Sequence, residues 1–359
     1  MKDHKITISD STLRDGNHAI KHQLNAEQIA AYCKAADAAG VGIVEVGHGN
    51  GIGASSLQLG ESKTTDLIAL EMARKNLVKS KLGIHVIPGF ATIERDLKPA
   101  LDLGVDLVRV AAHCSEADIC ERHISFSRSM GVEVWGCLMM SHMLSPAMLL
   151  EQARKMESYG AEGVVFMDSS GHFLPKDVRQ RVELLASELS ISIGFHAHNN
   201  LGLAIANSVE AADSGANLLD GCARGFGAGA GNAQIEVLVA VLKMMGYITD
   251  IDLYKILDAS DLAEQLIIKE IPAIKSVSVV SGMAGVFSGF MHPVNRVSRQ
   301  FNVDPRDVFF ELGRKKIVAG QEDIILEVAK DISARTEKGG AYEPGMAKEN
   351  SSRLFENLE

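Results

Sequence analysis

The residues of this chain that are best suited to chemistry lie in two separate runs. In the first, Arg14, Asp15 and His18 place a guanidinium, a carboxylate and an imidazole within five positions, around a glycine. In the second, His196 and His198 supply two imidazoles two positions apart. Side chains two positions apart on a strand point to the same side. One carboxylate and two histidines can together hold a divalent metal, which leaves the arginine and the third histidine for chemistry.

The ligand types narrow the choice of metal without deciding it. Mixed imidazole and carboxylate ligands with open positions suit Mn²⁺, Fe²⁺ or Zn²⁺ better than Ca²⁺. Two histidines at a strand end can also form a hydrogen-bonded structural pair, and their spacing alone does not separate the two interpretations. The two asparagines after His198 and the pairing of Arg14 with Asp15 favour the metal. We therefore predict that Asp15, His196 and His198 hold a divalent ion.

Arg14 and His18 would then act beside the metal. The forked donors of an arginine suit a carboxylate or an enolate oxygen, so Arg14 predicts an anionic ligand. His18 follows on the same loop, and an imidazole with an ordinary pKa of about 6.5 is a natural general base. The alternative for His18 is an exposed loop histidine.

Three further histidines and a glycine-rich run are weaker signals. His48, His113 and His142 follow predicted strands, and a structural role is the better-supported interpretation for each. The run 225–231 opens a predicted helix, where backbone N–H groups can bind an anion, but it lacks the GxxxxGK[ST] pattern. We favour close approach of this backbone to the active site, with Asn232 as a helix cap or an outer ligand.

Short apolar runs that alternate with amphipathic stretches would position these residues. The predicted strands are 6–9, 42–46, 82–87, 107–111, 133–138, 163–167, 192–196 and 217–220. The helical patterns between them are 26–39, 65–75, 91–103, 115–130, 145–159, 175–189, 201–214 and 232–245. Such strand–helix units fit a (β/α)8 TIM barrel. The alternative is a doubly wound open sheet, but polar residues follow strands all around the set. A barrel brings all eight strand ends to one face, whereas an open sheet would concentrate such residues at one switch point.

Two further regions follow the predicted barrel, which we assign to residues 1–249. Residues 250–334 are typical of helices separated by prolines, and we predict a C-terminal helical extension that docks a partner. Its predicted helices are 252–259, 262–269, 294–302, 306–312 and 322–332. Residues 335–359 are polar and are predicted to form a flexible tail.

The overall composition excludes several classes of function. The 359-residue chain has a formal net charge of −10, which argues against a surface for nucleic acid or anionic membrane. Its five cysteines form no CxxC pair, which argues against a disulfide framework. No uncharged apolar run approaches the ~18 residues that span a bilayer, and the N-terminal residues lack the apolar core of a signal peptide. We expect a cytoplasmic enzyme or binding protein.

Several motifs resemble a known superfamily. The run 10–16, Asp-Ser-Thr-Leu-Arg-Asp-Gly, is similar to the first-strand signature of metal-dependent lyases and synthases such as HMG-CoA lyase, isopropylmalate and homocitrate synthases and the carboxyltransferase part of pyruvate carboxylase. Asn17-His18 stands where the acyl-CoA synthases usually carry Glu-Gln, which favours the 4-hydroxy-2-oxovalerate aldolase branch. Further matching motifs are at 45–49, 113–118, 138–143, 156–160, 196–201, 227–233 and 320–323.

The resemblance implies a pyruvate-specific aldolase that cleaves or forms a 4-hydroxy-2-oxo acid such as 4-hydroxy-2-oxovalerate, with an aldehyde as the second product. Asp15, His196 and His198 would bind Mn²⁺, with Co²⁺ or Mg²⁺ as substitutes. Arg14 would stabilise the pyruvate enolate, and His18 would take the proton from the 4-hydroxyl. The C-terminal helices would bind an acylating aldehyde dehydrogenase, and we expect the chain to form an oligomer.

Three positions bear on the far end of the substrate. Ser169 matches a substrate-contacting serine of the aldolases. Phe287 stands where they carry a tyrosine, and its ring cannot donate a hydrogen bond. His85 replaces a leucine at the aldehyde end of the pocket, which favours a larger or more polar aldehyde than acetaldehyde.

Two alternative functions belong to other classes. One is a transferase of the isopropylmalate synthase type, which condenses a 2-oxo acid with an acyl-CoA. The other is a partner subunit whose barrel mainly scaffolds a second enzyme, although a scaffold has no need for the intact set of ligands.

Overall fold

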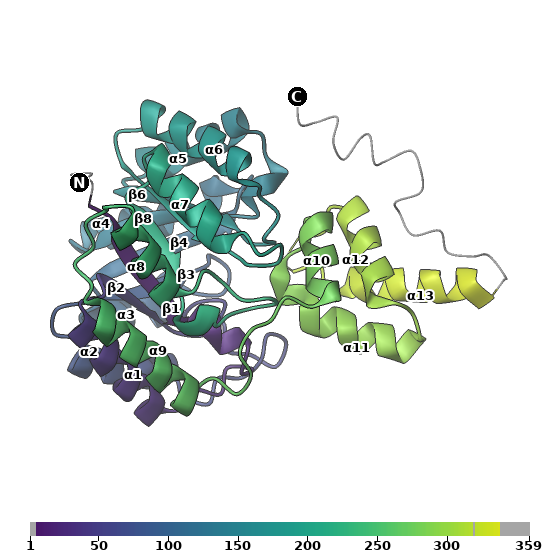
Figure 1. The fold of residues 1–359 in the computed structure, drawn as a ribbon, viewed down its shortest axis with the longest axis horizontal. Coiled ribbons are helices and arrows are strands. Elements are labelled where there is room, and N and C mark those ends of the chain that lie inside the picture. Colours follow the sequence, from purple (N-terminus) through teal and green to yellow (C-terminus); the bar gives the residue numbers. More distant parts are fainter. Residues whose placement is uncertain (1–4, 319, 338–359) are drawn as a thin grey trace.

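Eight parallel strands close into a barrel in the computed structural model, which describes residues 5–318 and 320–337 (Figure 1). Each strand pairs with the next, and β1 closes the ring on β8 through pairs such as Ser9 with Asp220. The strands are β1 (Thr7–Leu13), β2 (Ile43–Val46), β3 (Lys81–Val86), β4 (Leu107–His113), β5 (Glu133–Met139), β6 (Gly163–Asp168), β7 (Ser192–Ala197) and β8 (Leu218–Gly221). The closed ring confirms the predicted TIM barrel and excludes the open sheet.

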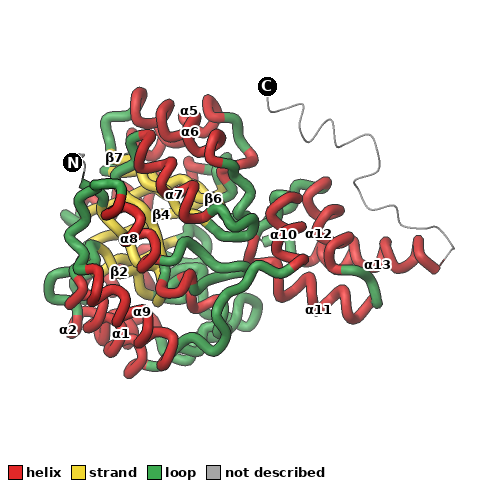
Figure 2. The backbone as a smooth tube through the Cα atoms, in the orientation of Figure 1, coloured by secondary structure: helices red, strands yellow, loops and turns green. Residues whose placement is uncertain are grey.

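Helices alternate with the strands and cover the outside of the barrel (Figure 2). They are α1 (Ala26–Ala39), α2 (Asp66–Asn76), α3 (Lys98–Asp102), α4 (Glu121–Ser129), α5 (Pro146–Ser158), α6 (Pro175–Glu188), α7 (Ala204–Ser214) and α8 (Ile235–Met244). Local sequence sets their ends. Asn25 and Gln28 form a capping box at the start of α1, and Gly40 ends it in the left-handed conformation. No helix in the described part of the chain is long and apolar enough to cross a membrane.

The helices after the barrel differ from the sequence prediction in two places. The predicted helices 252–259 and 262–269 form one helix, α9 (Leu253–Leu266), because no glycine or proline separates them. This helix packs on α1, and its apolar side chains belong to the core around the barrel. The sequence did not predict α10 (Ser276–Ala284), whose β-branched residues are weak helix formers. Packing against α12 (Pro305–Arg314) stabilises it instead.

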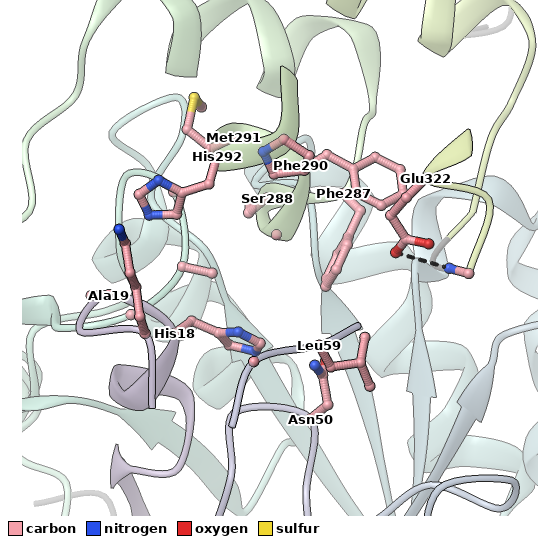
Figure 3. Close-up of a pocket in the computed structure, with 18 of the residues that line it drawn as sticks. His18, Ala19, Asn50, Leu59, Phe287, Ser288, Phe290, Met291, His292 and Glu322 are labelled. Atoms are coloured by element: carbon pink, nitrogen blue, oxygen red, sulfur yellow. Dashed lines mark hydrogen bonds between the residues drawn. The ribbon is translucent and has the colours of Figure 1, made fainter. Parts of the chain in front are cut away.

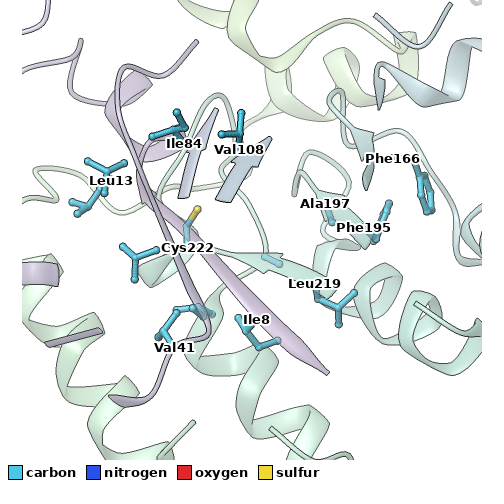
Figure 4. Packing of buried hydrophobic residues seen from close by; sticks show 14 of the residues in the cluster. Ile8, Leu13, Val41, Ile84, Val108, Phe166, Phe195, Ala197, Leu219 and Cys222 are labelled. Atoms are coloured by element: carbon cyan, nitrogen blue, oxygen red, sulfur yellow. The ribbon is translucent and has the colours of Figure 1, made fainter. Parts of the chain in front are cut away.

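Two large apolar cores lie outside the interior of the barrel. The larger core lies between the strands and the surrounding helices, where Ile8, Val108 and Phe195 are buried (Figure 4). The smaller core joins α10 and α12 to α11 (Met291–Phe301) and α13 (Asp323–Glu337). Figure 1 draws this C-terminal group of helices beside the barrel. The remainder of the predicted tail, 338–359, lies outside the described residues.

The C-terminal helices meet the barrel at the carboxyl ends of its strands, through a set of contacts that we call the junction. Ser288 N donates to the carbonyl oxygen of Ser169 at 3.0 Å. Nε2 of His142 donates to the carbonyl oxygen of Gly285, also at 3.0 Å. The junction therefore places the helical region over the face where barrel enzymes carry their active sites.

The interior of the barrel is divided into an apolar layer and a charged layer. Ile43, Leu107 and Leu218 belong to one apolar cluster inside the ring. The charged layer consists of the ionisable residues two positions further along these strands. It also includes one histidine each from β3 and β7. Its members, each at most 2% exposed, are Glu45, His85, Arg109, His196 and Asp220. Because side chains two positions apart share a side, the strands themselves direct these charges into the barrel.

Candidate active site and metal centre

The three predicted metal ligands converge at the mouth of the barrel. Asp15 begins the short 3₁₀ helix (Asp15–His18) that follows β1, while His196 and His198 lie at the end of β7. One donor atom from each of the three side chains lies within 4.8 Å of the other two, and all three residues are buried. This is the spacing of a site that can hold one divalent ion.

Asp15 is held in place by hydrogen bonds to both of its oxygens. Oδ1 accepts from Nη1 of Arg14 at 2.9 Å, and Oδ2 accepts from Nδ2 of Asn232 at 2.6 Å. A Cβ atom at Gly227 would collide with both Asn232 and Asp15, so the glycine-rich run permits the close approach that its sequence predicts. Burial alone raises the pKa of Asp15, but the charge of Arg14 outweighs it and holds the pKa well below its usual range. The carboxylate is therefore ionised.

Arg14 is fixed from two sides and keeps one free donor. Its Nε donates to Oε2 of Glu45 at 2.8 Å, and its Nη1 donates to Asp15. The third nitrogen, Nη2, is buried without a hydrogen-bond partner among the described residues. A buried donor without a partner is costly, so this nitrogen marks a position for a ligand acceptor.

His18 lies at the end of the same 3₁₀ helix and lines the cavity described below. Its ring packs on Gly49, where an added Cβ atom would lie 2.6 Å from ring atoms. Burial lowers the pKa of His18 below its usual value, although the nearby carboxylate of Asp15 opposes this shift. The imidazole is therefore neutral near pH 7 and can accept a proton.

A cavity of about 1580 Å³ lies between the barrel mouth and the C-terminal helices and is lined by residues of both. Figure 3 shows His18, Asn50 and Leu59 on the barrel side, facing Phe287, Ser288 and His292 on the helical side. The ring of Phe287 packs edge-on against Phe290, with 5.6 Å between ring centroids. The predicted position of Phe287 beside a substrate pocket is thus compatible with the structure.

Two other predicted substrate residues lie behind the cavity wall. Ser169 follows β6, and its Oγ accepts from Met140 N–H at 3.0 Å while its carbonyl oxygen joins the junction. His85 belongs to the charged layer, where its Nδ1 lies 3.5 Å from Oε1 of Glu45. Burial lowers the pKa of His85 to about 4, and the charge of Arg14 adds to this effect. Neither residue is among the described residues that line the cavity.

The three histidines that were weak signals take different positions. His48 stacks on His22 with 3.5 Å between ring centroids, and so supports the loop under His18. His113 lines the cavity, and His142 belongs to the junction.

The sequence prediction did not name Glu45 or Asp220 as site residues, although both contact residues of the predicted site. Glu45 orients Arg14, and Oδ2 of Asp220 accepts from Nδ1 of His196 at 2.8 Å. A signal was available, because each is an acidic residue at an inward-facing position of an apolar strand. Burial of such a charge is rare unless it is paired.

The donors and charges of this group fit a divalent cation. Burial lowers the pKa of His198 to about 4, so its imidazole is neutral, and its Nδ1 has no hydrogen-bond partner among the described residues. The buried cluster contains two guanidiniums and three carboxylates, which leave one negative charge. These residues are Arg14, Arg109, Asp15, Glu45 and Asp220. A cation would offset that charge, which makes the Asp15, His196 and His198 group a candidate divalent-metal site.

Comparison with known families agrees with the fold and the site. Residues 5–263 match the HMGL-like family model, and residues 272–334 match a DmpG-like communication domain. The closed barrel and its buried Asp/His/His group therefore place this chain in the class of HMGL-like enzymes. The communication domain implies that the C-terminal helices interact with a partner.

Close relatives define the family more narrowly. A 4-hydroxy-2-oxovalerate aldolase of Spirochaeta aurantia is 62% identical over 330 residues, which cover 92% of this chain and 97% of the relative. The enzyme of that name from Pectobacterium atrosepticum is 59% identical over 333 residues, covering 93% and 97%. The chain belongs to the family of 4-hydroxy-2-oxovalerate aldolases.

Solved structures of lower identity share the fold. The carboxyl transferase domain of Rhizobium etli pyruvate carboxylase, in a structure with pyruvate, superimposes with a TM-score of 0.77 at 13% identity. The match covers 98% of this chain and 65% of that one.

Proposed function

We propose that this chain is a divalent-metal-dependent pyruvate aldolase. It cleaves 4-hydroxy-2-oxovalerate, or a related 4-hydroxy-2-oxo acid, to pyruvate and an aldehyde, or joins them in the reverse direction. The observation that carries the proposal is the convergence of the buried Asp15, His196 and His198 donors beside the free Nη2 of Arg14. Membership of the aldolase family supports the same substrate class.

We assign Mn²⁺ to the site, with Co²⁺ or Mg²⁺ as functional substitutes. One carboxylate and two imidazoles form a mixed oxygen and nitrogen donor set, which suits such ions when positions stay open for substrate. When bound, the ion would supply a Lewis acid for the 2-oxo acid end of the substrate.

Arg14 would stabilise the pyruvate enolate through its free donor. Glu45 and Asp15 hold the guanidinium from two sides, so Nη2 needs no rearrangement to meet the oxygen on which charge develops. A donor that is already oriented in a water-poor site stabilises such charge more than one that must reorganise.

His18 would act as the base in the cleavage direction. A ring nitrogen of the neutral imidazole would accept the proton of the 4-hydroxyl group, directly or through water. As that O–H bond breaks, the carbonyl group of the aldehyde forms and the electrons of the C3–C4 bond pass to the enolate of pyruvate. In the reverse direction the protonated His18 would return the proton to the new hydroxyl group.

Ser169, Phe287 and His85 would shape the remainder of the substrate site. Phe287 would provide an apolar wall for the aldehyde end, since its ring lines the cavity (Figure 3). Ser169, at the end of β6, would shape the site through Met140, which lines the cavity and whose N–H donates to Oγ of Ser169. His85 would act from behind the wall through its contact with Glu45, and so limit which aldehydes fit.

The partner of the C-terminal helices would be an acylating aldehyde dehydrogenase, which consumes the aldehyde product. An aldehyde released into bulk water would be diluted before a second enzyme could use it. The cavity between the barrel and the communication domain supports a partner on this side of the molecule.

The decisive test measures pyruvate release by the full-length chain after its metals have been removed with a chelator. We expect turnover of 4-hydroxy-2-oxovalerate only after Mn²⁺ is restored, and longer or more polar analogues would then rank the aldehydes. No turnover of any analogue by protein with bound metal would contradict the proposal. Release of free CoA from an acyl-CoA and a 2-oxo acid would indicate the transferase instead.

A further inference from the structure

The charged layer contains a chain of contacts that ends on one metal ligand. Arg109 on β4 is fully buried and crosses the interior of the barrel to Asp220 on β8. Its Nη1 and Nη2 donate to the two carboxylate oxygens of Asp220 at 3.1 and 2.7 Å. Oδ2 of Asp220 also accepts from Nδ1 of His196 at 2.8 Å.

These contacts determine which nitrogen of His196 carries its proton. The guanidinium of Arg109 pairs with both oxygens of Asp220, and this two-pronged ion pair keeps the carboxylate charged. An ionised carboxylate accepts hydrogen bonds and cannot donate them, so the proton of His196 lies on Nδ1. The lone pair on Nε2 is therefore left for a metal.

Stability alone does not account for this chain of charges. A buried ion pair contributes little more than well-packed apolar side chains of similar size would, because both charges lose their hydration. The neighbouring layer of the same barrel is apolar, with Leu107 and Leu218 two positions away on the same strands. The charged pair therefore needs an explanation in function.

We propose that Arg109 and Asp220 are positioning residues for the metal. Arg109 holds the carboxylate of Asp220, and Asp220 holds Nδ1 of His196, so that Nε2 is the nitrogen left for the metal. The inference rests on the metal-dependent function proposed above, and it assigns a role to two side chains that do not themselves bind metal or substrate.

The test is the affinity of the metal-free, full-length chain for Mn²⁺, measured by isothermal titration at fixed pH. We expect Asp220→Asn to raise the dissociation constant by about 10- to 100-fold, the usual effect of removing a carboxylate behind a metal-bound histidine. Nitrogen-15 NMR of the metal-free protein should also show that Asp220→Asn changes the tautomer of His196. Arg109→Lys keeps the charge but loses the two-pronged contact of the guanidinium with Asp220. It should raise the dissociation constant by a smaller factor.

The matched control is Asp37→Asn. Asp37, in α1, is also a structural carboxylate, but it accepts from the backbone N–H groups of Val78, Lys79 and Ser80 just before β3 rather than from a metal ligand. We expect it to lower the melting temperature and leave the Mn²⁺ affinity unchanged. A folded Asp220→Asn protein with wild-type affinity would overturn the inference, and if that variant does not fold, unchanged affinity in Arg109→Lys would do so. A wild-type chain that binds no Mn²⁺ would instead contradict the proposed function.

Discussion

The barrel and the C-terminal helices have different kinds of interior. The barrel buries a layer of charged side chains, among them Glu45, Arg109 and Asp220, directly beneath the candidate metal site. The C-terminal helices bury apolar residues such as Val294, Phe309 and Ile325 and a few serines, but no charged side chain among the residues described. Buried charges are expensive, and they persist where chemistry requires them. The comparison indicates that chemistry belongs to the barrel, whereas the C-terminal helices provide a stable surface for a partner.

The largest expected effect comes from Asp15→Asn, which tests the chemical half of this comparison. Loss of the metal's carboxylate removes several kcal/mol of transition-state stabilisation, so pyruvate release should fall by on the order of a thousandfold or more. Binding of the partner dehydrogenase, measured by surface plasmon resonance, should not change. Substantial residual turnover with Mn²⁺ would show that the assignment of Asp15 is wrong.

The second prediction tests whether the C-terminal core is independent of the site. Phe309 is fully buried there, and Phe309→Ala should destabilise this region by about 3–5 kcal/mol through the lost contacts and the cavity left behind. Calorimetry should show that the helical region unfolds at a lower temperature. The Mn²⁺ affinity of the barrel should not change. Phe195→Ala, in the barrel core, is the control and should lower the transition of the barrel. A loss of metal affinity in Phe309→Ala would mean that the two regions are coupled.

The third prediction concerns the junction between the two regions. Burial, with a contribution from His172, lowers the pKa of His142 to about 3. Because the folded pKa lies below the unfolded value of about 6.5, His142 contributes stability above pH 6.5 that is lost as the pH falls toward 3. The loss should be at most about 1.4 kcal/mol per pH unit.

The measurement is the unfolding free energy at several pH values between 7 and 4, for the wild type and for His142→Gln. The glutamine amide can still donate to the carbonyl oxygen of Gly285 but does not titrate. The unfolding free energy of His142→Gln should therefore depend less steeply on pH than that of the wild type. Identical slopes of unfolding free energy against pH for the two proteins would show that His142 does not cause the pH dependence.

The smallest expected effect comes from Phe287→Tyr, which adds a hydroxyl group on the helical side of the cavity. One neutral hydrogen bond contributes about 0.5–1.5 kcal/mol, so kcat/KM should change by no more than about tenfold. Steady-state kinetics with substrates of different aldehyde length would measure this change in kcat/KM. Phe310→Tyr, outside the described cavity lining, is the control and should leave the kinetics unchanged. A change of several hundredfold would place Phe287 in the chemical step.

The strands and most helices of the barrel were predictable because their signals are local. Apolar periodicity marks each element, and residues such as Asn25 and Gly40 mark where a helix begins and ends. The convergence of Asp15 with His196 and His198 was predictable as well, since each follows a strand and a barrel brings all strand ends together. The helix α10 was not predictable, because tertiary packing overrides the weak helix propensity of its residues.

The sequence alone therefore predicts the barrel, the aldolase resemblance and the three candidate metal ligands, all of which depend on local pattern and strand order. Tertiary structure was needed to pair Arg109 with Asp220, 111 positions apart, and to place His85 behind the cavity wall. Alternation along a strand tells which side chains face the interior, but not which of them meet across it. That choice depends on the closure and stagger of the whole ring, to which every strand contributes.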